Sequence, residues 1–303
     1  MPFHDLTVAV IHYQTPELLD QCLDDLLPSV PGARVLVVDA GDAEPLPAAW
    51  SKDGVELLRV RNHSFAHAVN TALEACDTDY FAHLNADSFV SRTTFGDLLS
   101  VLIADPELGM TGPRVVAGNG ELQNQGLPYR RFQRLLEVPA AGWHAASGRF
   151  GRELHYVRVP WLSGCLQLVR MSAVRAAGPL DESQRFTNEE TDWCLRFGRA
   201  GFGCALVDTH TLHLGGTSTP KHPAFLIEGL RGSMVVSQRY APAWWSELQR
   251  LAVWGWASLA GVLALRPTGR RAARTVQRMF RERSFDTPVF GATLAEPLLP
   301  ERD

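Results

Sequence analysis

The segment that decides the fold is Tyr80–Asp87, which reads YFAHLNAD. It opens with a short apolar run of strand length and ends on the polar triplet Asn85-Ala86-Asp87. Short apolar runs that alternate with helix-like stretches are typical of βαβ units around a parallel sheet. Polar residues at the carboxyl end of such a strand lie at the edge where open α/β sheets hold ligands. The segment therefore predicts a strand that ends at a binding site.

The chain around this strand repeats the same alternation over about the first 110 residues. Pro16 favours a helix start, because the first helical position needs no N–H. Residues 111–160 have weak periodicity, and we expect irregular structure and short strands there. The fold class predicted is α/β, with a mostly parallel sheet flanked by helices and a C-terminal helical extension. The expected strands are Val8–Ile11, Arg34–Val38, Val55–Val60, Tyr80–Leu84, Leu166–Val169 and Cys204–Asp208, and the expected helices include 67–76, 172–177 and 189–200.

The composition limits the class of protein. With 303 residues and 46% hydrophobic content, the chain can bury a sizeable core. Five cysteines without a CxxC pattern sit in apolar segments, which fits buried thiols in a reducing compartment. The N-terminus lacks a basic region followed by an apolar run, so we expect a cytoplasmic protein. A net charge of −4 argues against a nucleic-acid partner.

Two common phosphate-binding devices are excluded. A dinucleotide fingerprint needs glycines after the first strand, and the first glycine of the chain is Gly32. A P-loop needs a lysine after a glycine, and neither Lys52 nor Lys221 has that context. If the chain binds phosphates, metal and side chains must hold them.

Two groups of carboxylates are candidates for this chemistry. Asp87 could bind a hard cation that bridges a diphosphate, or it could instead cap the next helix. Glu189, Glu190 and Asp192 lie within four residues, where mutual repulsion raises a pKa and favours a cation or an incoming proton. The alternative is a charged first turn favoured by the helix dipole. His210 and His213 precede a glycine-rich turn, but a histidine alone is more often structural.

Seven short motifs occur in a fixed order along the chain. They are YQTPELL (13–19), VVDAGD (37–42), LNAD (84–87), WLSGC (161–165), GPLDE (178–182), ETDWCLR (190–196) and HLGGTS (213–218). Together they resemble family 2 glycosyltransferases, most closely the bacterial rhamnosyltransferase-like branch, over about residues 6–220. The ordered set is far more specific than any single motif.

The resemblance implies a GT-A fold, with a nucleotide-binding half at about 1–110, an acceptor half at about 111–235, and a helical, basic extension and tail at 236–303. It implies an enzyme that inverts the anomeric carbon by direct displacement with Mg²⁺ or Mn²⁺. The expected donor is a dTDP- or UDP-sugar, with rhamnose as the leading sugar. The expected acceptor is a cell-envelope polysaccharide or a lipid-linked precursor.

The resemblance also assigns residues. Glu190 takes the place of the base that removes the proton of the acceptor hydroxyl, with Glu189 and Asp192 as alternatives. The metal, which offsets charge on the departing diphosphate, is expected at Asp87 and His213. The nucleotide sugar is expected at Thr15, Glu17, Asp39, Asn62, Asn70 and Asn85, and the acceptor at Trp161, Gly164 and Trp193.

Several positions depart from the family pattern. Gln14 replaces a usual Asn, Ala40-Gly41 replaces a common Asn-Gly pair, and Asn85 stands where the first aspartate of the metal motif often is. Glu190 replaces the more frequent Asp, which moves the base by about 1.5 Å unless the backbone compensates. Two other functions stay open. One is a nucleotidyltransferase, although its usual Gly- and Lys-containing loop is absent, and the other is a catalytically impaired glycan- or membrane-binding protein.

The C-terminal region has a separate pattern. Leu251–Leu265 is an apolar run of 15 residues, shorter than the roughly 20 needed to span a bilayer. The tract Arg266–Arg283 follows with seven arginines and one glutamate. The pair predicts a peripheral anchor on an anionic membrane surface, at the inner face of the cell membrane. The alternatives are a helix packed on the domain and a homo-oligomer interface.

Overall fold

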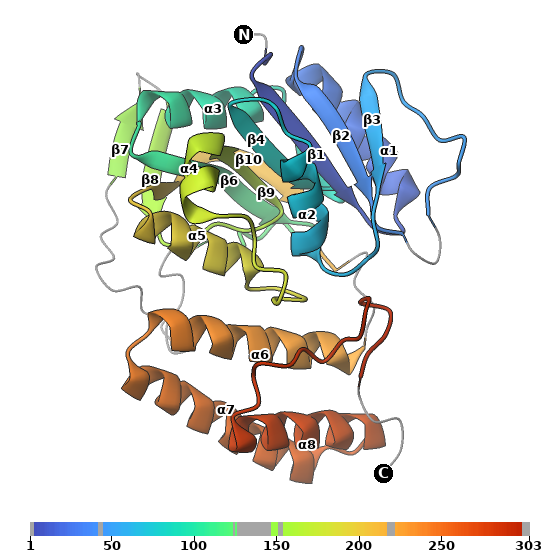
Figure 1. Cartoon of the computed structure of the whole chain (residues 1–303), viewed down its shortest axis with the longest axis vertical. Coiled ribbons are helices and arrows are strands. Elements are labelled where there is room, and N and C mark those ends of the chain that lie inside the picture. Colours follow the sequence, from blue (N-terminus) through green and yellow to red (C-terminus); the bar gives the residue numbers. More distant parts are fainter. Residues whose placement is uncertain are drawn as a thin grey trace.

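The computed structural model describes residues 3–41, 45–123, 125, 147–150, 154–216 and 222–298. In this part of the chain ten strands form one mixed sheet, in the order β3-β2-β1-β4-β9-β6-β10-β8-β7, with β5 paired to β10. Helices cover both faces of the sheet, and three further helices form a layer at one end of the molecule (Figure 1). The mixed α/β, mostly parallel sheet predicted from the sequence is confirmed.

The N-terminal half of the sheet is parallel. β1 (Leu6–His12) pairs with β2 (Arg34–Asp39) and β4 (Tyr80–Asn85), and β2 pairs with β3 (Val55–Arg59). Every residue of β1 is buried, as expected for a strand covered on both faces. The register places His12 opposite Asp39 and Ile11 opposite Asn85, so the carboxyl ends of three strands meet.

Alternate residues of β1 face two different cores. Val8 and Val10 face the core formed with α1 (Pro16–Leu26) and α3 (Thr94–Ala104). Ala9 and Ile11 face the core on the other side of the sheet. That second face is covered by α2 (Phe65–Glu74), α4 (Met171–Ala177) and α5 (Glu189–Arg199) (Figure 1).

The prediction of irregular structure after residue 110 is wrong at its start. β6 (Leu108–Ala117) is a ten-residue strand in the middle of the sheet, between β9 (Leu166–Arg170) and β10 (Gly203–His213). Its glycines hide its apolar pattern, and packing requires at least one of them. A Cβ at Gly109 would lie 2.6 Å from the Phe197 ring.

Short strands do follow, as predicted. They are β7 (Ser147–Phe150) and β8 (Leu154–Val159), and β5 (Ser88–Val90) is a third short strand nearer the N-terminus. The other residues of 111–160 that were expected to be irregular lie largely outside the described residues. His210 and His213 belong to β10 itself, which extends past the predicted end at Asp208.

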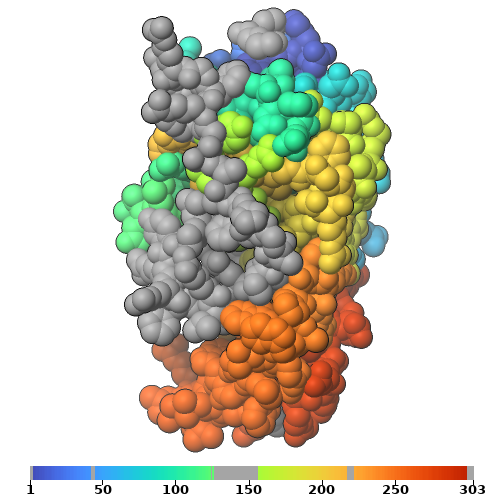
Figure 2. Space-filling model, turned by 90° about the vertical axis from the view of Figure 1, so that its left-hand side faces the viewer, coloured from blue at the N-terminus to red at the C-terminus, as the bar shows by residue number. Residues whose placement is uncertain are grey.

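Three helices follow the sheet and make a layer of their own. They are α6 (Pro223–Tyr240), α7 (Ala243–Leu263) and α8 (Pro267–Glu282), and they share a core with Phe280, Phe285 and Phe290. In Figure 2 this layer, orange to red, forms one end of the molecule.

Residues 284–298 form a return segment that runs back from α8 to the sheet. An extended tail was expected, yet Phe285 and Phe290 are buried. The Leu294 N–H donates to the Asn62 carbonyl (2.9 Å) and a ring nitrogen of His63 bonds the Ala292 carbonyl (3.0 Å). The return segment therefore ties the chain's C-terminal part to a loop that precedes α2.

Candidate active site

A buried relay fixes the ends of β1 and β2. His12 Nδ1 lies 3.0 Å from Asp39 Oδ1, and His12 Nε2 accepts the Thr15 backbone N–H at 3.1 Å. Since Nε2 accepts the Thr15 N–H, Nδ1 is the ring nitrogen that donates to Asp39. Asp39 also accepts the backbone N–H groups of Gly41 and Leu46. Asp39 thus helps to position the loop after β1, through His12, and the loop after β2, through the two backbone N–H groups.

His12 is a site residue that sequence reasoning missed. It ends an apolar strand, and only the register with β2 shows that it faces Asp39. Gln14, two residues after His12, has φ 53°, in the left-handed region that Asn occupies more readily than Gln. The usual family residue at this position is therefore explained by the turn. Thr15 is half-buried at the start of α1, and Glu17 is exposed in its first turn.

Asn70 holds a neighbouring loop with its whole side-chain amide. Its Nδ2 donates to the Leu180 carbonyl (3.0 Å) and to Glu182 (2.9 Å), and its Oδ1 accepts the Leu180 N–H (2.9 Å). Asn70 therefore fastens the GPLDE motif to α2, and the structure does not bring its amide to the strand ends. Asn62 is buried on the loop held by the return segment.

Asn85, Asp87 and His213 come together at the carboxyl end of β4, and we call them the metal corner. His213 Nε2 lies 3.3 Å from Asp87 Oδ1 and 3.4 Å from Asn85 Nδ2. The pairing of β5 with β10 causes this proximity, since it sets His213 opposite Ser88. Asp87 is buried, and the buried Asn85 Oδ1 has no protein partner.

The metal corner has the donors that a divalent ion requires. A carboxylate, an amide oxygen without a partner and an imidazole nitrogen suit Mg²⁺ or Mn²⁺. Within the described ranges, no three His, Cys, Asp or Glu side chains form a complete metal cluster, so a bound ion would need oxygens from a ligand. The alternative role of Asp87 as a helix cap is wrong, because Asp87 precedes strand β5 and α3 begins at Thr94.

The first turn of α5, Glu189–Asp192, contains two kinds of carboxylate. Glu189 and Glu190 each have a buried Oε2 without a hydrogen-bond partner. Burial raises the pKa of Glu189 well above its usual range, and the charge of Glu190 raises it further. Burial also raises the pKa of Glu190. These two side chains are the groups in this turn that are ready to exchange a proton.

Asp192, in contrast, is fully occupied by the protein. It is 0% exposed. Its carboxylate accepts Arg196 Nε (2.8 Å), Arg239 Nη1 (3.0 Å) and Tyr240 Oη (2.8 Å). The last two partners belong to α6. Asp192 therefore joins the helical layer to the catalytic sheet, and the structure does not support it as a base.

The segment Trp161–Cys165 connects the metal corner to the first turn of α5. The Cys165 carbonyl accepts the Asn85 N–H at 2.9 Å. One residue earlier, a Cβ at Gly164 would lie 3.3 Å from Glu190 Cβ. Trp161 is half-buried beside them. Asn85, Gly164 and Glu190 are thus neighbours although they are far apart in the sequence.

The structure places Trp193 in the core. It is 0% exposed, donates its indole N–H to the Gly178 carbonyl at 2.9 Å, and packs on Phe197 in the core. Helical spacing turns residues 193 and 197 inward together. The expectation that Trp193 contacts the acceptor is corrected on this ground.

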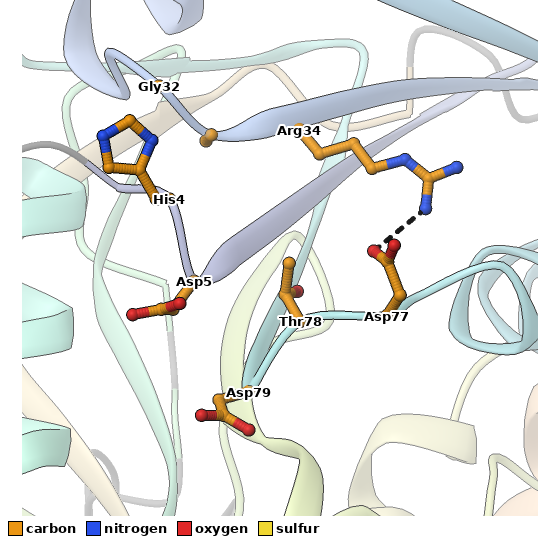
Figure 3. Close-up of a pocket in the computed structure, with 8 residues that line it drawn as sticks. His4, Asp5, Gly32, Arg34, Asp77, Thr78 and Asp79 are labelled. Atoms are coloured by element: carbon orange, nitrogen blue, oxygen red, sulfur yellow. Dashed lines mark hydrogen bonds and ion pairs between the residues drawn. The ribbon is translucent and has the colours of Figure 1, made fainter.

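A separate hollow of about 540 Å³ lies at the opposite edge of the sheet. Figure 3 shows its polar lining, in which Arg34 reaches Asp77 (3.3 Å) beside the start of β1 and β4. Arg34 also binds Glu56. This hollow is at the amino ends of the strands, away from the metal corner, and its arginine is already paired with two carboxylates. The lining residues are His4, Asp5, Gly32, Ala33, Arg34, Asp77, Thr78 and Asp79.

The fold and this carboxyl-edge site define a glycosyltransferase of the GT-A type. The chain belongs to glycosyl transferase family 2, whose family model matches residues 7–175. Two solved glycosyltransferases share the fold over 93% of this chain. GalNAc-T7 with UDP, GalNAc and Mn²⁺ has a TM-score of 0.57 and 13% identity, and the match covers 56% of that chain. The mannosyltransferase PcManGT of Pyrobaculum calidifontis, in complex with GDP-Man and Mn²⁺, has a TM-score of 0.52 and 17% identity, and the match covers 85% of that chain.

Two relatives from Mycobacterium tuberculosis are similar in sequence. A pre-mycofactocin glycosyltransferase is 31% identical over 181 residues, which are 58% of this chain and 36% of that protein. The chain thus spans little more than a third of that relative's length. An N-acetylglucosaminyl-diphospho-decaprenol L-rhamnosyltransferase is 25% identical over 300 residues, which cover 89% of this chain and 95% of the relative.

Proposed function

We propose that this glycosyltransferase inverts the anomeric carbon of a nucleotide-diphosphate sugar as it transfers the sugar to a lipid-linked acceptor at a membrane. The observation that carries the proposal is the link through Trp161–Cys165. One backbone segment holds Asn85 of the metal corner at one residue and contacts Glu190 at the previous one. A diphosphate and an acceptor hydroxyl would therefore meet between a cation-binding group and a proton acceptor.

Glu190 is the proposed base. In direct displacement the acceptor hydroxyl must lose its proton as it attacks C1 of the sugar. Glu190 has a buried carboxylate oxygen without a partner and a raised pKa, which suits a base that acts near neutral pH. Glu189 remains the second candidate, since its carboxylate is also buried without a complete set of partners. No covalent enzyme intermediate is required.

Asp87, His213 and Asn85 are the proposed holders of Mg²⁺ or Mn²⁺. A bound ion would offset the charge that builds on the departing diphosphate. The protein's own contribution is to fix the ligands: β5 sets Asp87, β10 sets His213, and the Cys165 carbonyl sets Asn85. Two structural neighbours determined with Mn²⁺ support a divalent ion.

The loops after β1 and β2 are the proposed site of the nucleotide. Thr15 and Asp39 contact His12, Glu17 follows in the first turn of α1, and the loop that contains Asn62 lies at the start of α2. Asp39 already accepts hydrogen bonds from His12, Gly41 and Leu46, so we propose that it acts by shaping these loops.

The rhamnosyltransferase relative supports the choice of substrates, because its match extends over nearly its full length. As its name states, that relative transfers L-rhamnose to N-acetylglucosaminyl-diphospho-decaprenol. We therefore propose dTDP-rhamnose as the first donor to test and a polyprenyl-diphosphate sugar as the acceptor. Such an acceptor would place the enzyme at the inner face of the cell membrane in the assembly of an envelope glycan.

The experiment is a donor panel. Full-length protein is incubated with dTDP-rhamnose, UDP-N-acetylglucosamine or GDP-mannose, with Mg²⁺, Mn²⁺ or EDTA, and with a short-chain polyprenyl-diphosphate sugar. We expect one donor to be consumed with transfer, and no transfer in EDTA. Release of pyrophosphate from a nucleoside triphosphate and a sugar phosphate would indicate a nucleotidyltransferase instead. Transfer that persists in EDTA would contradict the metal assignment.

A further inference from the structure

α7 exposes large apolar side chains along most of its length. Its outward face, which we call the α7 apolar face, runs about 27 Å from Trp244 to Val262 and has apolar side chains throughout. Trp244 is 67% exposed and Val262 is 76% exposed. Such a long exposed apolar face marks an interaction surface. The α7 apolar face consists of Trp244, Leu248, Leu251, Leu259 and Val262, flanked by Trp256 and Leu263.

The polar residues of α7 are on its packed side. Ser246 bonds Ser237 (3.0 Å) and Gln249 donates to Ser233 (3.1 Å), both on α6. Arg250 donates to the Phe280 carbonyl of α8 (2.6 Å). These contacts fix the rotation of α7, so its apolar face cannot turn inward without breaking them.

The helix that packs against α7, α8, exposes cationic side chains. That helix buries Ala273, Val276, Met279 and Phe280, and its five arginines are exposed on the remaining sides. The acidic residues of α7 and α8 are Glu247 and Glu282, and each is paired with arginine. α7 and α8 together form a helical hairpin, and its exposed surface is therefore apolar and positively charged. The exposed arginines are Arg270, Arg271, Arg274, Arg278 and Arg281.

The charge distinguishes between two partners for this surface. A second copy docked face to face would bring two arginine-rich helices together, which like-charge repulsion opposes. An anionic bilayer offers acyl chains for the apolar face and phosphate groups for the arginines. No helix in the described part of the chain has both the length and the hydropathy to cross a bilayer.

We propose that the α7 apolar face inserts into the interface of an anionic phospholipid bilayer while the α8 arginines bind its headgroups. The hairpin forms the end of the molecule farthest from the amino ends of β1 and β4 (Figure 1). α6 lies between the hairpin and α5, and its Arg239 and Tyr240 hold Asp192. The inference rests on the proposed function only in placing the protein at a membrane, and it is independent of the sugar transferred.

The test is sedimentation of full-length protein with vesicles of phosphatidylcholine alone or with 30% phosphatidylglycerol added, at low and high salt. We expect binding only to the anionic vesicles, and weaker binding as salt rises. Leu251→Glu combined with Leu259→Glu should abolish the binding. Arg271→Gln, Arg274→Gln and Arg278→Gln together should weaken it about a hundredfold. Ile103→Glu on α3 and Arg175→Gln on α4 are the matched controls, because both residues are exposed but far along the chain from the hairpin.

Circular dichroism and donor hydrolysis are measured on every variant. The proposal is supported if the leucine and arginine variants lose vesicle binding but still hydrolyse the donor. If the wild-type protein binds vesicles but hydrolyses no donor, the membrane-binding surface is supported and the proposed function is contradicted. The proposal is overturned if the protein binds neutral and anionic vesicles equally well, or if both the leucine variant and the arginine variant still bind. A stable dimer in solution that the two leucine changes convert to monomers also overturns it.

Discussion

The metal corner and the first turn of α5 both contain buried carboxylates, but these carboxylates differ in the partners that the protein gives them. At the metal corner, Asp87 already touches His213, so the group is positioned before any ligand arrives. In the first turn of α5, Glu190 keeps an oxygen without a partner while Asp192, two residues later, has three. Neighbouring acidic residues in a sequence can therefore have opposite roles, and their partners decide which.

The largest effect is expected at the metal corner. Asp87→Ala should lower donor affinity in Mn²⁺ by about a thousandfold, because the diphosphate loses the ligand that holds its counter-ion. Titration calorimetry measures this directly. The control is Asp53→Ala at an exposed position. Equal affinity in the variant, or in wild type with EDTA, would show that the metal is held elsewhere or not at all.

A smaller but selective effect is expected at Glu190. Glu190→Gln preserves size and should lower kcat by about a hundredfold while leaving the KM for the donor unchanged. Glu189→Gln is the matched control and should lower kcat less. Nearly full activity in Glu190→Gln, with loss in Glu189→Gln, would move the base by one residue.

The pH dependence sharpens the same comparison. Glu190 must be ionised to accept a proton, and burial raises its pKa above that of an ordinary glutamate. Activity should therefore fall as pH is lowered through this raised pKa, so the acid limb of kcat against pH lies above the usual glutamate range. A limb within the usual range, or the same limb in Glu190→Gln, would assign it to another group.

The smallest effect on chemistry is expected at Asp192. Asp192→Asn should lower the free energy of unfolding by about 2 kcal/mol, since the change weakens a buried carboxylate's bonds to partly exposed arginines. In the fraction that folds, kcat should stay within about threefold of wild type. Denaturant unfolding and a double-mutant cycle with Arg239→Met measure the coupling. If the Asp192→Asn protein is folded but inactive, Asp192 becomes a candidate for the catalytic base again.

The sequence was sufficient to predict those strands whose own residue pattern identifies them. β1, β2 and β4 are buried on both faces, so they are continuous apolar runs with polar residues at their carboxyl ends. β6 was missed because Gly109 and Gly112 are required by close packing, which no periodicity reveals. His12 was missed because its partner Asp39 is known only from the register.

The proximity of two motif residues was predicted from the sequence, whereas the surroundings of other motif residues depend on partners that the sequence does not reveal. Asp87 and His213 do meet, as the resemblance implied. Two of the three partners of Asp192 come from α6, a helix that the sequence patterns did not predict. Trp193 stands in a motif beside Glu190, but the helical period turns it into the core. Their roles as ligand-binding residues stay predictions until measured.

The return segment also bears on how the protein is made. His63 and Ala292, which it brings together, are 229 positions apart in the chain. Domains begin to fold from the N-terminus during synthesis, so the sheet can form while α6, α7 and α8 are still being translated. The loop before α2 gains its contacts with the return segment only after those helices have been made. A nascent chain therefore completes the packing of this loop after the three helices of the C-terminal layer are synthesised.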